Sequence, residues 1–336
     1  MKRFGLIGHP VAHSLSPLLF RAGYHLDRED GATGTPSALG TPGHPGPGYD
    51  LIEGACFESS WRRFLDGYDG INVTAPFKEL AFRQADIIDP VCREIGATNL
   101  IIKSPDGLKA YNSDYYGIIL SVLEAVRKTD TEAQAGRSPM PEARPSAEKC
   151  RAAFKGKLRT ALVVGCGGAG KAAAVAAGNM GLDTILMNRT AAKAEAIAAG
   201  LPEYGFKVRP IGEFKECFAA TDLILYTLPA PVADIASLTD SDFSPVLHSC
   251  TDSPDMDGPE RDSAPRKLLL EANYRNPSFP DALISRQMRI HKGFIYIPGI
   301  HWLLYQAYAG YDLFTGKSPD LAAMRQAVGI EYAGQD

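Results

Sequence analysis

Residues 160–179 read TALVVGCGGAGKAAAVAAGN, and this stretch decides the fold of the chain. The apolar and β-branched residues 160–164 predict a buried strand, and the alanine-rich residues after Gly170 predict a helix. Gly165, Gly167 and Gly170 follow the spacing G-x-G-x-x-G. That spacing is specific only where a strand runs into it and a helix leaves it, as happens here. The stretch therefore predicts a turn that binds a dinucleotide.

Each residue of this turn has a separate task. Gly165 allows the tight turn, Gly167 lets the backbone approach a pyrophosphate, and Gly170 lets helix and strand pack closely. Gly168 and Ala169 begin the helix, whose free N–H groups can bind phosphate. The alternative is a glycine-rich turn that binds no ligand.

Basic residues follow the next predicted strand, at the place that sets the choice of cofactor. Enzymes that use NAD carry an acidic residue there, which binds the ribose 2′-hydroxyl. This chain has Asn188, Arg189 and Thr190, with Lys193 one turn later. Arginine can pair with a 2′-phosphate through two hydrogen bonds. Basic side chains at a helix N-terminus oppose the helix dipole, so they call for another role. NADP (NADPH) is therefore the predicted cofactor, and a solvated basic helix start is the alternative.

Strands alternate with helices along most of the chain, which predicts an α/β fold with a parallel, doubly wound sheet. A length of 336 residues suggests two domains. We expect an N-terminal α/β substrate domain, residues 1–122 and 299–336, and a Rossmann-type doubly wound NAD(P)-binding domain, residues 123–298. Two proline-containing stretches, residues 27–48 and 127–157, are predicted as a surface loop and an inserted linker.

The individual elements follow from hydrophobic periodicity and from turn residues. Strands are expected at residues 4–8, 49–56, 70–73, 99–103, 108–111, 160–164, 184–188, 223–227 and 268–273. Helices are expected at residues 14–26, 60–65, 76–82, 114–126, 191–199 and 299–314, and from the glycine-rich turn to about residue 179.

Composition excludes several classes of protein. The formal net charge of −4 with mixed signs gives no general attraction to nucleic acid or to an anionic membrane. The six cysteines are scattered without a CxxC pair, which argues against a zinc site or a disulfide framework and favours reduced thiols. Neither a signal peptide nor an apolar run of about 18 residues is present. A cytoplasmic protein without a bound metal is therefore expected.

Two polar segments of the N-terminal third could bind a small substrate. Ser14 and Ser16 stand at a predicted helix start, where hydroxyl and free N–H groups suit a carboxylate. The alternative there is simple helix capping by one serine. Further on, Thr74 follows a predicted strand and Lys78 lies in the first turn of the next helix. A lysine there could transfer a proton, and the alternative is a solvated surface residue.

These segments resemble motifs of the shikimate dehydrogenase family. Residues 5–17 resemble its opening motif, residues 72–79 its NVTxPFKE motif and residues 96–99 its GAxN motif. Residues 112–117 resemble its N-[TS]-D-x-x-G motif, and residues 306–307 its closing QA pair. The glycine-rich turn and the N-R-T sequence that follows it match the family's NADP-binding pattern. The matches span most of the chain in the order of the family.

The resemblance implies an oxidoreductase of the shikimate pathway, which reversibly reduces 3-dehydroshikimate to shikimate with NADPH in aromatic amino acid biosynthesis. Lys78 and Asp114 would be the catalytic pair. The substrate-binding residues that it implies are Ser14, Ser16, Asn72, Thr74, Asn99, Tyr274 and Gln306. The cofactor-binding residues that it implies are Gly165, Gly167, Gly168, Ala169, Gly170, Asn188, Arg189, Thr190, Lys193 and Gly299. No partner other than the small-molecule substrate is implied, and a homodimer is left open.

Local roles are the alternatives for several of these residues. Asn99 could satisfy a turn, Thr74 or Asp114 could cap a helix, and Gln306 could be an ordinary buried amide.

The chain also departs from the family's pattern. Residues 225–229 read LYTLP where the family has a strand that ends in N-A-T, which puts the cofactor geometry in doubt. Trp302 stands where the family usually has methionine. Two further functions are therefore kept as alternatives: a quinate/shikimate dehydrogenase that uses NAD, and a non-catalytic NADP-binding regulatory homologue.

Overall fold

The computed structural model describes residues 2–24, 48–131, 142–247 and 266–330. The chain divides into two compact units, Met1–Ser113 with Gln306–Asp336 and Asp114–Tyr305. Both boundaries between the units lie in helices, α5 (Ser113–Thr131) and α11 (Gly299–Thr315). The predicted boundaries, at residues 122 and 299, lie in these helices too, and the domain bounds themselves stay a prediction. Residues 27–47 of the predicted loop, residues 132–141 of the predicted linker and Cys250 lie outside the described residues.

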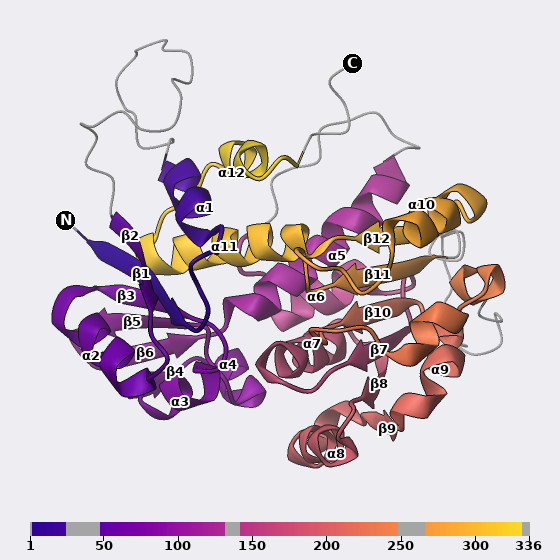
Figure 1. The fold of residues 1–336 in the computed structure, drawn as a ribbon, viewed down its shortest axis with the longest axis horizontal. Coiled ribbons are helices and arrows are strands. Elements are labelled where there is room, and N and C mark those ends of the chain that lie inside the picture. Colours follow the sequence, from indigo (N-terminus) through magenta and orange to yellow (C-terminus); the bar gives the residue numbers. More distant parts are fainter. Residues whose placement is uncertain (1, 25–47, 132–141, 248–265, 331–336) are drawn as a thin grey trace, which may run out of the picture. The chain divides into compact units, whose positions relative to one another are not determined.

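The first unit contains a six-stranded mixed sheet in the order β2-β1-β3-β5-β6-β4 (Figure 1). Its strands are β1 (Arg3–Gly8), β2 (Gly48–Glu53), β3 (Gly70–Val73), β4 (Ile87–Ile88), β5 (Leu100–Ser104) and β6 (Gly107–Tyr111). Its helices are α1 (Ser16–Gly23), α2 (Phe57–Gly67), α3 (Lys78–Arg83), α4 (Pro90–Ile95), α12 (Leu321–Ala327) and the second part of α11. Strands β3 and β6 are each antiparallel to β5, whereas β1 is parallel to both β2 and β3.

Aromatic side chains cover both faces of this sheet. Phe57, Trp61 and Phe64 recur at helical spacing on α2 and pack with strand residues such as Ile71 in one hydrophobic cluster. On the other face, the rings of Phe4 in β1 and Phe314 in α11 stack with their centroids 4.5 Å apart. The sheet therefore has an apolar core on each side, and its polar groups collect at its edges.

The second unit contains a six-stranded, wholly parallel sheet in the order β12-β11-β10-β7-β8-β9. Its strands are β7 (Thr160–Val164), β8 (Asp183–Met187), β9 (Lys207–Arg209), β10 (Leu223–Tyr226), β11 (Lys267–Glu271) and β12 (Phe294–Ile297). Its helices are α5, α6 (Ala147–Phe154), α7 (Gly168–Asn179), α8 (Ala191–Gly200), α9 (Phe214–Ala220), α10 (Asp281–Ile290) and the first part of α11.

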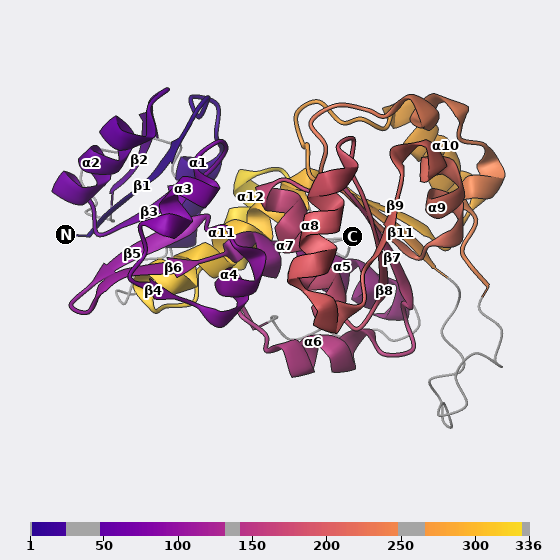
Figure 2. The same cartoon turned by 90° about the horizontal axis from the view of Figure 1, so that it is seen from below.

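Helices cover both faces of this parallel sheet, with α7 and α8 on one side and α9 and α10 on the other (Figure 2). The chain runs outward from β7 through β8 to β9, and then returns to β10 on the other side of β7. The order of the strands thus reverses between β7 and β10, which is where doubly wound sheets bind ligands. The predicted fold class, an α/β substrate domain and a Rossmann-type domain, is confirmed.

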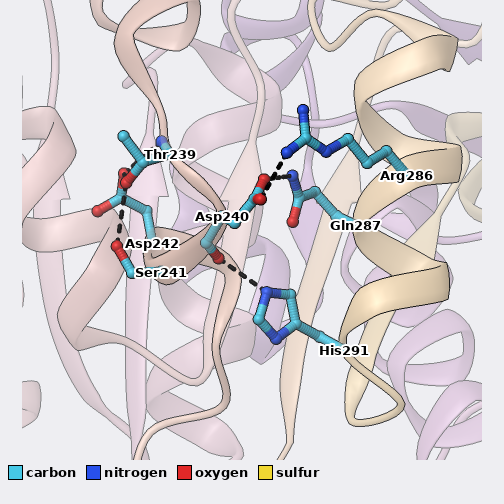
Figure 3. A network of polar contacts seen from close by, with 7 residues as sticks. All are labelled: Thr239, Asp240, Ser241, Asp242, Arg286, Gln287 and His291. Atoms are coloured by element: carbon cyan, nitrogen blue, oxygen red, sulfur yellow. Dashed lines mark hydrogen bonds and ion pairs between the residues drawn. The ribbon is translucent and has the colours of Figure 1, made fainter.

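Polar contacts fix the outer part of the second unit, and Figure 3 shows one such network. Asp240 accepts hydrogen bonds from Gln287 and Arg286 of α10, at 2.7 and 2.6 Å, and these two groups hold the pKa of its carboxyl below the usual range. His291 Nε2 lies 2.8 Å from the carbonyl oxygen of Asp240. The segment after β10 is thereby attached to α10.

The buried Lys267 at the start of β11 is a second such attachment. Its ammonium donates to the carbonyl oxygens of Phe218, Ala219 and Thr221 at the end of α9, at 2.8 to 3.0 Å. Burial lowers the pKa of Lys267 to about 8. A cation suits this place because the last carbonyl groups of a helix have no partner within it.

Part of the sequence-based assignment is wrong. The expected linker at residues 127–157 contains the end of α5 and the whole of α6, in which Phe154 is fully buried. Helix α6 begins after Ser146, whose side chain accepts the N–H of Lys149. Helix α1 begins at Ser16 and not at residue 14, and the Ser14 hydroxyl accepts the N–H of Ser16 from outside the helix. Besides α6, the helices and strands that the sequence did not indicate are β4, α4, β9, α9, α10, β12 and α12.

No helix in the described ranges is both long and apolar enough to cross a membrane. The described cysteines are free thiols, at positions 56, 92, 150, 166 and 217.

Candidate active site

One edge of the first sheet gathers the segments that were predicted to bind substrate. Strands β1 and β3 are parallel, so both end there, and the antiparallel β5 begins there. Three backbone hydrogen bonds join the segments: Val73 N–H to Asn99 O at 2.8 Å, Thr74 N–H to Ile7 O at 2.9 Å, and Asn99 N–H to Tyr111 O at 3.3 Å. Residues that are far apart in the sequence therefore lie together at this edge.

Asn72 is buried at this edge and makes two side-chain hydrogen bonds. Its oxygen accepts the Tyr49 hydroxyl at 2.7 Å, and its nitrogen donates to Asn99 O at 3.1 Å. Burial raises the pKa of Tyr49, against a smaller effect of its hydrogen bond with Ser16. These contacts connect β2, β3 and the start of α1. Asn72 thus holds the edge together, and its direct contact with substrate stays a prediction.

Asn99 fixes the start of α5. Its fully buried side chain accepts the N–H of Ser113 at 2.7 Å and donates to the Ser113 hydroxyl at 3.1 Å. Asn112 adds a hydrogen bond to Ala97 O at 2.8 Å. Because α5 begins at Ser113, Asp114 lies inside the first turn and does not occupy the cap position. Asp114 is buried, with 4% of its surface exposed, and the contacts of Asn99 fix the helical turn that carries it.

Ser14, Thr74 and Lys78 surround the ends of β1 and β3. Leu15 occupies the N-cap position of α1 and its side chain makes no capping bond, whereas the Ser14 hydroxyl accepts the N–H of Ser16, the first residue of the helix, at 3.2 Å. One serine thus serves the start of the helix, and the hydroxyls of Ser14 and Ser16 lie 3.0 Å apart. Lys78 is the first residue of α3, is half-buried, and accepts the N–H of Thr98 on its carbonyl oxygen at 3.2 Å. The backbone of Lys78 is thus tied to the segment that leads into Asn99.

The glycine-rich turn of the second unit follows β7. Gly165 has a φ of +105°, which favours glycine, and a Cβ at Gly170 would overlap the carbonyl oxygen of Gly165. Protein packing therefore requires glycine at both positions. At Gly167 the situation differs, because a Cβ there would meet nothing within 4 Å and the φ of −83° suits any residue. Only a molecule that approaches this backbone would need glycine at residue 167.

Asn188 connects this turn to the end of β8. Its side chain accepts the N–H of Cys166 at 3.1 Å and donates to Thr190 O at 2.9 Å. Burial raises the pKa of the Cys166 thiol to about 11, and the nearby Lys193 ammonium opposes this increase. Lys193 and Arg189 are exposed, and neither side chain makes a hydrogen bond or ion pair with the residues that the structure describes. These cations can therefore accept an anionic group beside the turn.

Thr227 is a residue of this site that sequence reasoning missed. Its hydroxyl donates to Val164 O at 3.0 Å and approaches Gly165 O at 3.3 Å. It lies in residues 225–229, the segment that departs from the family's pattern. The hydroxyl of the buried Tyr226 donates to Ala230 O at 2.8 Å and accepts the N–H of Val232. The segment thus braces the glycine-rich turn from β10.

The start of α11 lies at the carboxyl end of β11. A Cβ at Gly299 would overlap the carbonyl oxygen of Ala272 and lie 2.6 Å from that of Glu271. In the same turn of α11, the buried Trp302 donates from its indole nitrogen to Asp114 O at 3.1 Å. The first turn of α5 and the start of α11 are therefore neighbours within the second unit.

Tyr274 follows β11 in a turn. The side-chain oxygen of Asn273 accepts the N–H groups of Arg275 and Asn276, at 3.2 and 3.1 Å, and so holds this turn. Before it, the buried carboxyl of Glu271 accepts the N–H of Ser278 and the hydroxyl of Tyr296, and burial raises the pKa of Glu271. No pattern along the chain indicated these supporting contacts.

The predicted site residues are therefore divided between the two units. Ser14, Ser16, Asn72, Thr74, Lys78 and Asn99 belong to the first unit, as does Gln306, which is half-buried in α11. The predicted cofactor residues belong to the second unit, together with Asp114 and Tyr274. The pairing of Lys78 with Asp114, and the roles of the individual site residues, stay predictions.

Comparison with known proteins identifies two matching family models. The model of the shikimate dehydrogenase substrate binding domain matches residues 6–101. The model of the shikimate 5'-dehydrogenase C-terminal domain matches residues 299–328.

Solved structures support the fold. Shikimate 5-dehydrogenase from Thermus thermophilus, in complex with NADP(H) and shikimate, aligns with a TM-score of 0.64 and 24% identity over 98% of this chain and 99% of that chain. Shikimate dehydrogenase from Mycobacterium tuberculosis aligns with a TM-score of 0.65 and 23% identity over 98% and 99%.

Curated relatives cover nearly the whole length of the chain. Shikimate dehydrogenase (NADP(+)) of Moorella thermoacetica is 28% identical over 98% of this chain and 94% of its own. The enzyme of the same name from Rubrobacter xylanophilus is 30% identical over 97% of this chain and 95% of its own. The protein therefore belongs to the shikimate dehydrogenase family.

Proposed function

We propose that the protein is an NADPH-dependent shikimate dehydrogenase, which reversibly reduces 3-dehydroshikimate to shikimate. Its relatives carry this name with NADP(+), and a related structure holds both NADP(H) and shikimate. The observation that carries the proposal is the meeting of the segments around Ser14, Thr74 and Asn99 at one sheet edge, from which α5 leads to Asp114.

The residues of the chain have separate tasks in this reaction. Ser14 and Ser16 bind the substrate carboxylate, while Thr74, Asn99 and Gln306 bind the ring hydroxyls. Lys78 stabilises the negative charge that develops on the ketone oxygen and supplies its proton. Asp114 orients that lysine. Bound NADPH supplies the hydride, so the reaction needs no metal.

The glycine-rich turn fits a dinucleotide. Its open Gly167 leaves room for a pyrophosphate beside the N-terminus of α7. The first N–H groups of a helix have no partner within it and can bind phosphate. Arg189 and Lys193 supply positive charge for a 2′-phosphate at the end of β8. The choice of NADP over NAD rests on these two side chains.

The direct test is turnover by the purified protein. We expect NADPH absorbance to fall on addition of 3-dehydroshikimate, and NADPH to form from NADP and shikimate. Shikimate and quinate are compared with NADP and NAD in a steady-state assay. Tight NADPH binding without turnover would instead support the regulatory homologue, and a preference for quinate with NAD would support the other alternative.

Replacing Arg189 with alanine should remove most of the preference for NADPH over NADH. A charge-assisted hydrogen bond contributes about 1.5–3 kcal/mol, which corresponds to a loss of roughly 10- to 100-fold in NADPH affinity. Affinity for NADH should change by less than about threefold, because NADH has no 2′-phosphate. Titration with each cofactor measures both dissociation constants. Lys207→Ala, a change at an exposed lysine in β9, is the control and should leave both unchanged. An unaltered ratio of the two constants in Arg189→Ala would remove Arg189 from cofactor choice.

We also propose a cytoplasmic location. Free cysteine thiols are typical of a reducing compartment. NADPH and the small-molecule substrate are the expected partners there.

A further inference from the structure

Trp302 makes a hydrogen bond to the backbone of a predicted catalytic residue. It is one of two tryptophans in the chain, is 4% exposed, and lies in the first turns of α11. Its indole N–H donates to Asp114 O at 3.1 Å. Methionine, the usual residue at this position in the family, has no N–H group and could not make this bond. The hydrogen bond therefore depends on the tryptophan that this chain carries in place of methionine.

The accepting carbonyl lies at the amino end of α5. A carbonyl oxygen has two lone pairs, so Asp114 O can accept the indole in addition to a bond within the helix. The next residues, Tyr115 and Ile118, are also buried. The indole thus acts on the helical turn that carries the Asp114 side chain, through the backbone carbonyl of that residue.

The turn that carries Trp302 is itself fixed. Gly299 packs against the carbonyl oxygens at the end of β11, where there is no space for a Cβ. His301 Nδ1 lies 3.5 Å from Glu124 Oε2 of α5, and both side chains are mostly buried. Two side chains of α11 therefore lie against α5, of which Trp302 makes the hydrogen bond, and β11 in turn positions α11. Contacts thus run from the end of β11 to Gly299, along the first turn of α11 to Trp302, and from its indole to Asp114 O.

We propose that Trp302 is a positioning residue, which sets the place of the Asp114 carboxylate through its backbone carbonyl. This inference rests on the proposed function, because it assumes that Asp114 orients the catalytic lysine. Loss of the bond should leave substrate and cofactor binding nearly intact and should slow the chemical step. A residue with a merely structural role would lower stability without separating kcat from KM.

The test compares Trp302→Phe with the wild-type protein. Phenylalanine keeps an aromatic ring and removes the donor, and we expect kcat to fall about tenfold, as loss of one neutral hydrogen bond implies. The KM values for shikimate and NADP should stay within about twofold. Trp302→Met also lacks a donor and should lose kcat to a similar extent, so it serves where the phenylalanine variant folds poorly. Trp61→Phe, a change in the α2 cluster, controls for tryptophan loss and should keep the wild-type kcat.

A second measurement does not depend on catalysis. The two indole N–H signals in the NMR spectrum are assigned with the variants, and we expect the Trp302 N–H to exchange slowly with solvent. A folded Trp302→Phe protein with kcat within about twofold of wild type would overturn the inference, and so would rapid exchange of this N–H. A wild-type protein that turns over no substrate would refute the proposed function instead, even with a protected indole.

Discussion

Replacing Lys78 with methionine is expected to lower kcat for 3-dehydroshikimate reduction by about a thousandfold, with KM changed by less than about threefold. The ketone oxygen becomes negative only as hydride arrives, so the ammonium group acts mainly on the transition state. General acid catalysis and charge stabilisation each typically contribute about 100-fold or more. Methionine has a similar length and no charge, and steady-state kinetics with NADPH measure both constants.

The variant keeps the backbone contact at this position. Lys78 accepts the Thr98 N–H on its carbonyl oxygen, and that bond does not depend on the side chain. Lys109→Met is the matched control, because Lys109 lies on β6 of the same unit and pairs with the exposed Asp106 at 3.6 Å. The control should keep the wild-type kcat. If Lys78→Met also kept kcat within about threefold, Lys78 would have no part in the chemistry.

The pairing of Lys78 with Asp114 can be separated from the role of either residue alone. If the carboxylate acts by orienting the lysine, Asp114→Asn should add less than about threefold to the loss in Lys78→Met. Independent losses that multiply in the double variant would show that the two groups act separately. The double-mutant cycle therefore tests the relation between the groups.

The parts of the fold that could be predicted from sequence have long or sharply bounded patterns. The apolar run of β7 ends at a glycine-rich turn, and its predicted bounds match the structure. Strand β4 has two residues and β9 has three, which is too short for any alternation to be visible. Helix α6 lies within residues 127–157, which their polar residues and three prolines predict as a linker, although its buried Phe154 and its Ser146 cap identify it in the structure.

The residues of the candidate site also fall into those that the sequence indicates and those that it does not. Motif residues such as Asn99 and Lys78 could be named because the family resemblance is local in sequence. The support around them is not local: Thr227 reaches Gly165 from 62 positions away, and Trp302 reaches Asp114 from 188 positions away. These contacts arise only when strands and helices are packed, so no pattern along the chain could indicate them. Ser14 shows the reverse case, since its hydroxyl makes a local bond, to the N–H of the first residue of α1, and a serine at a predicted helix start indicates such a bond.

Replacing Gly167 with alanine is expected to weaken NADPH binding by about 100-fold, or about 2.7 kcal/mol, without unfolding the protein. The added methyl group meets no protein atom within 4 Å, and the backbone there suits alanine. Stability should therefore stay within about 0.5 kcal/mol of wild type, as for a surface change away from special features. A bound pyrophosphate needs the space that this methyl group would occupy. Calorimetric titration with NADPH and thermal unfolding without it give the two numbers separately.

Gly170→Ala is the matched comparison, because its methyl group would overlap the carbonyl oxygen of Gly165. That overlap is with backbone, so the turn must shift, and both stability and NADPH binding should fall. A glycine-rich turn without a ligand would make Gly167→Ala silent in every assay while Gly170→Ala still lowers stability. NADPH binding and stability can respond differently at residue 167 only if a molecule approaches the backbone there. Equal NADPH affinity in Gly167→Ala and wild type would mean that the pyrophosphate does not bind at this turn.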